Sequence, residues 1–594
     1  MVAMAKDISY DTETTGLYLH GPHEMFSYST CGWDGEIDIC RLDGSKKRQV
    51  ANNSKLDEMF TWKPQFSSPV VMHNSKFDLT ATEKHLGRHV AEDVEFHDTY
   101  MQSHILQSNH PSHRLKDLAW ELAGIPKDDE SAVKSFVAEG GNYSNVPEQL
   151  MDEYQRWDAE RTMLLHRFLY PKIQASAAFS EIYQMELDLV KTTMRMEERG
   201  LMLNVPRTEK MIYKLEQDVE GVLDKIEEFA GERVNPNKTS QLAWLLFDKA
   251  KLPILERTAK SKQPKMDKNV IAQLRESNPH AVLDNILQFR SWSRGSTMLQ
   301  SYLDYADGEG IIHPDIRTCG AKTSRQSSSR PNLQNVQKEG VLLNPYPIPA
   351  RQCFRPRPGY VNFHLDYSGI ELRLLVDYAG EDKLRKIIIN GGDPHEPASL
   401  VFFRDRFKNA RGDLRATLRG ASKNMNFAIP YGAAAYKVAL GLGMPFEMGK
   451  ERFEDYRAQF PGLCGLNPRM AALVREQGYV ETKFGRWLWV PRNKSYMGTN
   501  YLIQGTAAGI LKRAQIKVHS YLQRATSGEV RMLLPIHDEL VFEFPRKRLG
   551  EAGHIFREVR RIMIDFPMFD VPLEVDVQVA TFDWSAKKMF NILV

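Results

Sequence analysis

The stretch Arg419-Gly-Ala-Ser-Lys-Asn-Met-Asn-Phe-Ala-Ile-Pro-Tyr-Gly432 places four chemically distinctive side chains at intervals of four residues. They are Arg419, Lys423, Phe427 and Tyr431. On an α-helix such residues stack along one face, which would carry two cations followed by two aromatic rings. That face suits a ligand with phosphate at one end and a flat base at the other. It is equally compatible with a surface helix whose aromatic end is half-buried, so the rest of the chain has to decide.

The composition is that of an ordinary globular protein. The chain has 594 residues, of which 42% are hydrophobic and 26% charged, and this length predicts about three to four domains. No apolar run is long enough to span a bilayer, and the N-terminus has no apolar signal core. The five cysteines are scattered, without a CxxC pair. This cysteine pattern indicates a reducing, cytoplasmic compartment (that of the host cell if the chain is viral) and no zinc site.

Charge is distributed unevenly along the chain. Residues 1–175 contain 18 Lys and Arg against 27 Asp and Glu, whereas the whole chain has a net charge of +3, so residues 176–594 are basic. A basic region joined to an acidic one suggests nucleic-acid binding in the former and carboxylate chemistry in the latter. Random drift of surface charge is the alternative explanation.

The segment from Ile8 to Leu17 is predicted to be a strand that runs into a turn, and it contains a pair of carboxylates. Asp11 and Glu13 are two residues apart, so in a strand both point to the same face. Two like charges on one face repel each other unless a cation lies between them, and oxygen ligands favour Mg²⁺ or Mn²⁺. Such pairs also occur on solvated strands.

Two later segments extend this pair into a recognisable series. One reads N-x-x-F-D and ends at Asp78, and the other reads Y-x-x-x-D from Tyr154 to Asp158 on a predicted helix. The series closely resembles the proofreading 3′–5′ exonuclease domain, which has an RNase H-like fold. The resemblance implies that Tyr154 helps to position the attacking water. It also implies that two metal ions are bound by four acids, Asp11, Glu13, Asp78 and Asp158.

Two further segments, Asp98 to Met101 and Leu115 to Leu118, also resemble the exonuclease family. We interpret them as packing or strand-end positions. Since all four acids are present, we predict an active exonuclease.

Residues 181–230 predict two long helices separated by Gly200, and shorter helices follow at 241–249, 269–276 and 282–294. A basic, unpatterned segment, 258–268, lies between them. By analogy with polymerases this region would be a thumb whose cations bind duplex backbone, although a solvated loop fits the segment equally well. We see no insertion of the kind that binds a thioredoxin-type processivity partner, and we predict none.

The segment from Thr323 to Asn335 reads T-S-R-Q-S-S-S-R-P-N-L-Q-N and closely matches a motif of family A DNA polymerases. The resemblance implies that Arg325, Asn332 and Gln334 contact the minor groove near the primer end. Minor-groove acceptors are nearly the same for every base pair, so these contacts would check geometry without reading sequence.

Two more segments match family A motifs, D-Y-S-x-I-E-L-R at Asp366 and H-D-E at His537. The first reads as a strand that ends in an acid, and the second as the turn of a hairpin. The resemblance implies that Asp366 and Asp538 bind two catalytic Mg²⁺ ions and that Glu539 is a supporting acid. His537 would meet the primer terminus, or is simply a turn histidine. Glu371 would exclude the ribose 2′-OH, or is a structural buried glutamate.

The same resemblance extends to helix residues that would bind DNA and nucleotide. Asn500 and Gln504, on one stripe with Lys512, would touch primer–template bases, and His395 of Asp393-Pro-His395 would lie near the triphosphate. In the opening stretch, the resemblance implies that two cations bind the triphosphate and that two rings contact bases. Arg419 and Lys423 are the cations, with Lys423 also a proton donor to pyrophosphate; Phe427 stacks on the incoming nucleotide and Tyr431 holds the place of the template base.

The chain departs from the family pattern at two places. Residues 494–499 lack the Glu-Arg pair that usually precedes the position of Asn500, which leaves one contact to DNA in doubt. Pro430 removes a backbone N–H and clashes with the preceding turn, so the central helix should kink or end near Tyr431.

We therefore predict a multidomain α/β and α+β protein: an RNase H-like exonuclease domain followed by a right-hand polymerase. The expected ranges are exonuclease 1–178, thumb and start of palm 179–340, first palm part 341–394, fingers 395–495 and second palm part 496–594. The expected activity is template-directed DNA synthesis from a primer and dNTPs, with two Mg²⁺ ions at each site (Mn²⁺ being possible), in a monomeric protein.

The chain resembles the short phage-type members of the family. We therefore expect no 5′-nuclease region before the exonuclease, and we expect the protein to replicate a phage-type genome. Two alternatives stay open at this stage. One is an RNA polymerase or reverse transcriptase on the same palm, against which Glu371 argues. The other is a replication scaffold with degenerate sites, against which the intact carboxylates argue.

Overall fold

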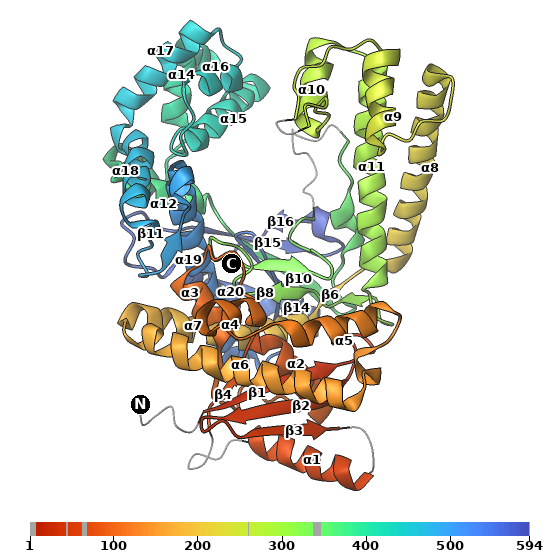
Figure 1. The fold of residues 1–594 in the computed structure, drawn as a ribbon. Helices are drawn as coiled ribbons and strands as arrows, with labels where there is room; N and C mark the ends of the chain where they lie inside the picture. Colours follow the sequence, from red (N-terminus) through yellow and green to blue (C-terminus); the bar gives the residue numbers. More distant parts are fainter. Residues whose placement is uncertain (1–6, 43–45, 62–67, 259–260, 337–345, 593–594) are drawn as a thin grey trace.

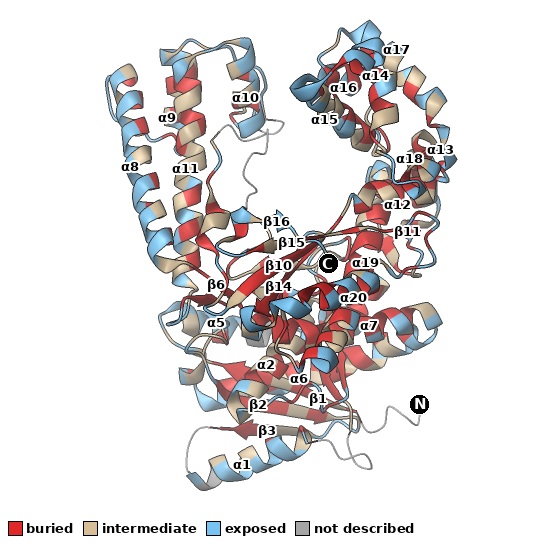
Figure 2. Ribbon diagram, turned by 180° about the vertical axis from the view of Figure 1, so that it is seen from behind, coloured by how far each residue is buried: buried red, intermediate tan, exposed pale blue. Residues whose placement is uncertain are grey.

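The computed structural model describes residues 7–42, 46–61, 68–258, 261–336 and 346–592. It has a mixed α/β fold (Figure 1) in which an N-terminal unit lies beneath a second sheet, and two helical arms rise from that sheet. The strands of both sheets are largely buried, whereas the outer sides of the arms are exposed (Figure 2). The expected boundary at 340/341 and part of the basic segment 258–268 lie outside the described residues.

A five-stranded sheet forms the N-terminal unit, with strand order β3-β2-β1-β4-β5. β1 pairs antiparallel with β2 and parallel with β4. The predicted strand at Ile8 and the predicted helices around Asp78 and residues 148–170 are confirmed. The strands are β1 (Ile8–Thr14), β2 (Met25–Gly32), β3 (Ile37–Arg41), β4 (Val70–Met72) and β5 (Phe96–Asp98). The helices are α1 (Lys46–Met59), α2 (Ser75–Leu86), α3 (Thr99–Leu106), α4 (Leu115–Ala123), α5 (Asp128–Ala138) and α6 (Glu148–Gln174).

Two long helices follow, as predicted. α7 (Ala177–Arg199) ends at Gly200, whose φ is 60°. A Cβ at this position would lie 2.5 Å from the Ile312 carbonyl oxygen. Only glycine tolerates both conditions. The first arm consists of α8 (Val205–Ala230), α9 (Thr239–Ala243), α10 (Lys268–Ser277) and α11 (Ala281–Asp304). α11 continues ten residues beyond the predicted end at 294 because its second half packs against α8.

The second sheet is antiparallel throughout, with strand order β13-β14-β10-β15-β16. The predicted hairpin is confirmed as β13 (Arg531–Ile536) and β14 (Glu539–Pro545), with His537 and Asp538 in the turn. The other strands are β10 (Tyr360–Tyr367), β15 (Val575–Ala580) and β16 (Lys588–Met589), and the long helices α19 (Gly498–Thr526) and α20 (Ala552–Ile564) pack against one another beside the sheet.

The second arm and its base contain the helices between β10 and α19. They are α12 (Ile370–Ala379), α13 (Asp382–Ile389), α14 (Glu396–Asn409), α15 (Gly412–Ala428), α16 (Ala435–Leu442), α17 (Phe446–Gln459) and α18 (Pro461–Gln477). α15 ends two residues before Pro430, as that proline predicts. Tyr431 therefore lies in the turn after the helix and not on it, which corrects the expectation of four residues on one helical face.

Buried ion pairs join the N-terminal unit to the rest of the chain. Glu186 of α7 is fully buried and accepts hydrogen bonds from Arg486 and from Lys512, the latter at 2.6 Å. Lys76 of α2 contacts Glu197 and Asp315, the latter also at 2.6 Å. No helix in the described ranges is both long and apolar enough to cross a bilayer.

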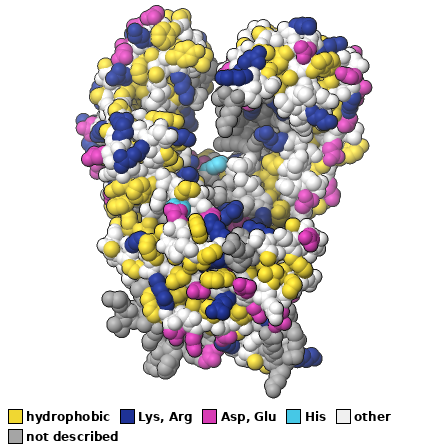
Figure 3. Space-filling view, viewed as in Figure 1, with side chains coloured by type: hydrophobic (Ala, Val, Ile, Leu, Met, Phe, Trp, Pro, Cys, Tyr) yellow, Lys and Arg dark blue, Asp and Glu magenta, His cyan; other side chains and the backbone are white. Residues whose placement is uncertain are grey.

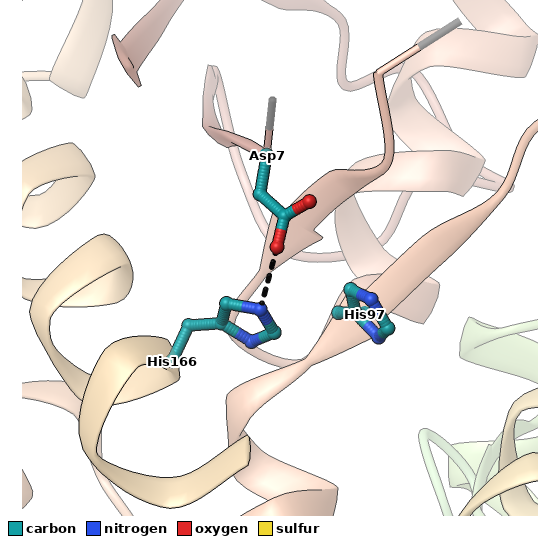
Figure 4. A group of neighbouring side chains, drawn as sticks. All are labelled: Asp7, His97 and His166. Atoms are coloured by element: carbon teal, nitrogen blue, oxygen red, sulfur yellow. Dashed lines mark hydrogen bonds and ion pairs between the residues drawn. The ribbon is translucent and has the colours of Figure 1, made fainter. Parts of the chain in front are cut away.

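Asp7, His97 and His166 form a buried cluster that joins β5 and α6 to the start of β1 (Figure 4). His166 Nε2 lies 3.0 Å from an Asp7 carboxylate oxygen, and the two imidazoles stack with centroids 4.7 Å apart. Gln102 contacts the other nitrogen of His166 at 3.0 Å. Burial, with a smaller contribution from His166, lowers the pKa of His97 to about 3.

This cluster should make the N-terminal sheet sensitive to acid. An unfolded His97 binds a proton as the pH falls below 6.5, whereas the folded one does not until about pH 3. The contribution of His97 to stability is therefore full above pH 6.5 and falls by about 1.4 kcal/mol for each unit below it. Hydrogen exchange of the β1 and β5 amides measures this slope. His97→Gln should reduce this slope by about 1.4 kcal/mol per pH unit, which corresponds to one proton. An unchanged slope would contradict the assignment.

Candidate active sites

The four acids predicted for the exonuclease lie on three elements that meet at the first sheet. Asp11 and Glu13 are on β1, Asp78 is on the first turn of α2, and Asp158 is on α6. Thr12 fixes Asp78 by donating from its backbone N–H at 3.1 Å and from its hydroxyl at 2.7 Å. A β1 residue between the two acids thus holds the third acid beside them.

Burial, with repulsion from neighbouring acids, raises the pKa values in this cluster. Burial, and then the charges of Asp78 and Glu13, raise the pKa of Asp11 well above its usual range. Burial and the charge of Asp158 raise the pKa of Glu13 to about 8. Burial raises the pKa of Asp78 to about 7, although the Thr12 hydrogen bonds oppose the shift. A cluster of oxygen ligands that resists ionisation in this way suits a hard divalent cation, which would restore the charged forms.

One residue of this site, Lys116 on α4, was not predicted from the sequence. Its ammonium nitrogen lies 3.4 Å from an Asp158 oxygen and 3.7 Å from the centre of the Tyr154 ring. The interpretation of Leu115 to Leu118 as packing is therefore wrong for Lys116. The sequence did contain a signal for Lys116, because the segment from Leu115 to Leu118 resembles the exonuclease family. For Asp98 the strand-end interpretation is confirmed, because its carboxylate caps α3 and accepts hydrogen bonds from Ser75.

A cavity of about 800 Å³ opens beside these acids. Lys116, Tyr154 and Asp158 line it on the N-terminal side. Its other wall comes from residues that follow α11 in the chain, among them Arg317 and Arg330. The cavity therefore lies between the N-terminal unit and the rest of the molecule.

The second pair of acids is brought together by the second sheet. Asp366 is on β10 directly opposite Glu539 of β14, and the backbone N–H of Tyr367 donates to the Asp538 carbonyl oxygen at 3.2 Å. Asp538 lies in the β13–β14 turn after His537, whose φ is 54°. Burial raises the pKa of Asp538, although Arg325 opposes the shift. Asp366 and Asp538 are thus neighbours across two strands.

Glu539 has partners that the sequence does not predict. Its carboxylate contacts His364 Nδ1 at 2.5 Å and Lys587 Nζ at 2.7 and 2.8 Å. Burial alone would raise the pKa of Glu539, but His364 and Lys587 lower it to about 2. Glu539 is therefore held as an anion by His364 of β10 and by Lys587 of the C-terminal segment. No pattern along the sequence predicts the contacts of Glu539 with His364 and Lys587, because these residues are far apart in the chain.

A hydrogen-bonded group connects the end of the central helix to the second site. One Glu371 oxygen accepts from Arg325 at 2.7 Å, and the other accepts from the Tyr431 hydroxyl at 3.1 Å. Arg325 also lines a small cavity together with Gln334, His537 and Asp538. The structure thus brings Arg325, Glu371 and Tyr431 into contact beside Asp538, although they come from three separate motifs.

The remaining residues of the opening stretch project from α15. Arg419 makes a two-pronged ion pair with Asp393 at 2.5 and 2.9 Å, while Lys423 is exposed. Phe427 packs near His395, with ring centroids 5.8 Å apart. Burial lowers the pKa of His395 to about 4, so at neutral pH it is an uncharged neighbour of the two cations.

The residues expected to bind DNA fall into two groups. Gln334, Asn500 and Gln504 are partly accessible, whereas Asn332 is exposed and its side chain accepts from the Gln334 backbone. Lys512 does not belong with Asn500 and Gln504, because it is buried against Glu186. Figure 3 shows an open space between the two arms, with Lys and Arg side chains along its borders.

Comparison with known proteins agrees with these features. Residues 205–586 match the family described as DNA polymerase family A, and residues 1–174 match the one described as 3′–5′ exonuclease. DNA polymerase I of Pseudomonas aeruginosa is 28% identical over 97% of this chain and 63% of its own length. The thermostable DNA polymerase I of Thermus aquaticus is 30% identical over 79% of this chain and 56% of its own.

The chain thus spans between about half and two thirds of these relatives. A solved structure, the POL domain of Pol1 from M. smegmatis in complex with DNA primer-template and dNTP, has the same fold. Its TM-score is 0.81 at 22% identity, and the match covers 98% of this chain and 96% of that one. By sequence and by fold, this chain belongs to DNA polymerase family A and carries a 3′–5′ exonuclease domain on its N-terminal side.

Proposed function

We propose that the chain is a template-directed DNA polymerase that extends a primer with dNTPs and proofreads with its 3′–5′ exonuclease. The observation that carries this proposal is the meeting of Asp366 and Asp538 beside the group of Arg325, Glu371 and Tyr431. We assign the exonuclease to 1–178, the thumb and start of the palm to 179–340, the palm to 341–394 and 496–594, and the fingers to 395–495. The 178/179 boundary falls in the first turn of α7.

At the polymerase site, Asp366 and Asp538 would hold two Mg²⁺ ions, which activate the primer 3′-OH and neutralise charge on the triphosphate. Arg419 and Lys423 bind the triphosphate, and Lys423 donates a proton to the departing pyrophosphate. For Arg419 to do so, its ion pair with Asp393 has to open or be shared. Phe427 stacks on the incoming nucleotide, and His395 lines the same end of α15.

Glu371 and Tyr431 set what the site admits. With the Tyr431 hydroxyl bound to Glu371, the ring occupies the place of the template base until the fingers close. Glu371 excludes a ribose 2′-OH, so dNTPs are used and rNTPs rejected; efficient rNTP incorporation would favour the RNA polymerase alternative. Asn332, Gln334, Asn500, Gln504 and His537 contact the primer–template.

At the exonuclease site, the four acids Asp11, Glu13, Asp78 and Asp158 would hold two Mg²⁺ ions, for which Mn²⁺ can substitute. Tyr154 positions the water that attacks the terminal phosphodiester. Its ring is held by Lys116, whose charge also offsets that of Asp158. Replication of a phage-type genome, and a monomeric state, stay predictions from the sequence.

Single substitutions should separate the two activities. Asp538→Ala should abolish primer extension and leave degradation of a 3′ single strand intact, because the two carboxylate groups lie on different sheets. Asp11→Ala should do the reverse. Both are measured on one labelled primer–template, with Mg²⁺ and with chelator. Undiminished extension by Asp538→Ala would refute the polymerase site, and loss of both activities in Asp11→Ala would refute the division of the chain.

Phe427→Tyr should relax discrimination against dideoxynucleotides. A dideoxynucleotide lacks the 3′-OH, and Phe427 has no hydroxyl that could replace the interaction of that group. Tyr offers a hydroxyl and thus one hydrogen bond, which should lower the discrimination between dNTP and ddNTP about tenfold or more. Competition between ddNTP and dNTP in primer extension measures the ratio. Tyr431→Phe serves as the aromatic control, and an unchanged ratio in Phe427→Tyr would exclude the stacking role.

Lys587→Met should impair the polymerase selectively. Loss of the cation removes both Lys587 contacts to the Glu539 carboxylate and leaves its contact with His364. Changes to residues that hold metal ligands commonly cost about 10- to 100-fold in activity or metal affinity. We expect slower extension and a higher Mg²⁺ requirement, both rescued in part by Lys587→Arg. Exonuclease activity of the same preparation is the internal control. Normal Mg²⁺ dependence would show that the contact is only structural.

A further inference from the structure

The cavity beside the exonuclease acids has a second wall that does not come from the exonuclease domain. That wall includes Asp315, Arg317 and Arg330. Asp315 and Arg317 belong to β8 (Asp315–Arg317), which forms a short hairpin with β9 (Ser327–Ser329), and Arg330 directly follows β9. In the hairpin Asp315 pairs with Ser329. The segment between these strands carries Arg325, which reaches Glu371 at the polymerase site. One hairpin thus faces both sites.

The hairpin is fixed relative to the exonuclease acids. Lys76 of α2 lies 2.6 Å from an Asp315 oxygen and donates to the Ile316 carbonyl oxygen at 2.8 Å. Asp78, one of the four acids, is two residues further along the same helix. On the hairpin itself, Asp315 accepts from the Ser329 hydroxyl at 3.1 Å and from Arg330 at 3.0 Å. The position of the arginines across the cavity is therefore set by the helix that carries Asp78.

Both arginines retain donors that are not used by the described parts of the chain. The Arg317 side chain is 60% exposed, and its nearest carboxylate oxygen, on Asp315, is 3.8 Å away, too far for a hydrogen bond. Arg330 lines the cavity with a side chain that is 30% exposed, and one of its terminal nitrogens donates to Asp315 at 3.0 Å. Its Nε has no hydrogen-bond partner among the described residues but is buried, so the terminal nitrogens are the groups that a ligand would meet. A guanidinium with free N–H groups beside a cavity is well suited to phosphate oxygens.

The ligand that this wall would face is a polyanion. A DNA strand in this cavity passes Asp158, which lines it, and carries one negative charge at each backbone phosphate. Arg317 and Arg330 on the opposite wall offer cations that bind such phosphates, which positions the strand without reading its sequence.

We propose that Arg317 and Arg330 form a phosphate-binding subsite for the single 3′ strand, so that the polymerase part of the chain completes the substrate site of the exonuclease. The inference rests on the proposed exonuclease function. It assigns both arginines as binding residues, not catalytic ones, and gives the β8–β9 hairpin a role at both sites.

The test uses the full chain with Arg317→Gln, Arg330→Gln and the double substitution. The probe is a 5′-labelled oligo-dT, and its hydrolysis with Mg²⁺ is followed over a range of substrate and salt concentrations. We expect KM to rise about three- to tenfold for each substitution, with kcat unchanged. The slope of log KM against log salt, between about 50 and 200 mM, should fall by about 0.7 for each backbone phosphate that the variant no longer binds. Extension of a fully paired primer should not change.

Controls separate this role from general effects of charge and stability. Arg385→Gln and Arg561→Gln remove a half-buried and an exposed arginine. Among the residues described by the structure, each pairs only with a carboxylate three residues away on its own helix. Neither substitution should change KM or the salt slope. Arg330→Lys keeps the charge and should restore part of the affinity. If Arg330→Gln proves unstable, the exposed Arg317 variant decides alone.

The outcomes distinguish this inference from the function on which it rests. If the unsubstituted chain degrades oligo-dT and the double variant shows the same KM and salt slope, the subsite is refuted and the exonuclease stands. If the unsubstituted chain fails to degrade oligo-dT with Mg²⁺ or Mn²⁺, the proposed exonuclease function is refuted, and the subsite with it.

Discussion

The structure has to hold carboxylates of like charge close together at two places. At the first sheet this requires hydrogen bonds from Thr12 and a lysine, Lys116, because four acids would otherwise repel one another. At the second sheet the register of β10 and β14 sets Asp366 opposite Glu539, and Lys587 neutralises the latter. Much of the surrounding fold serves to keep these groups in place, which explains why both clusters sit at sheets with buried strands (Figure 2).

Local patterns in the sequence predicted the elements that carry the acids. A strand-like run that leads into a turn identified β1, two apolar runs around a charged turn identified the β13–β14 hairpin, and the three- and four-residue spacing identified α7, α8 and α15. Pro430 predicted a kink or an end of the central helix near Tyr431, and the helix ends at Ala428. These features depend on residues near one another in the chain, and such interactions leave a periodic trace in the sequence.

The partners of the site residues could not be predicted in the same way. Asp393 binds Arg419, Lys587 binds Glu539, and Glu186 binds Lys512 across 326 residues. Each is a charge neutralised by a residue from another element, and only the folded arrangement shows which charges remain for a ligand. Lys512, for example, shares a stripe with Asn500 and Gln504 in the sequence but is buried in the interior against Glu186.

Helix α7 belongs to two hydrophobic cores. Most of its apolar residues, including Val190 and Met194, pack in the core of the N-terminal unit, while Met196 packs in the core of the polymerase part. α7 runs unbroken through both cores. Under the proposed function, such a connection keeps the distance between synthesis and excision fixed, so that a growing end reaches the exonuclease by separating from its template. The frequency of editing would then depend on how readily the last base pairs melt, which is a property of the DNA and not of a domain movement.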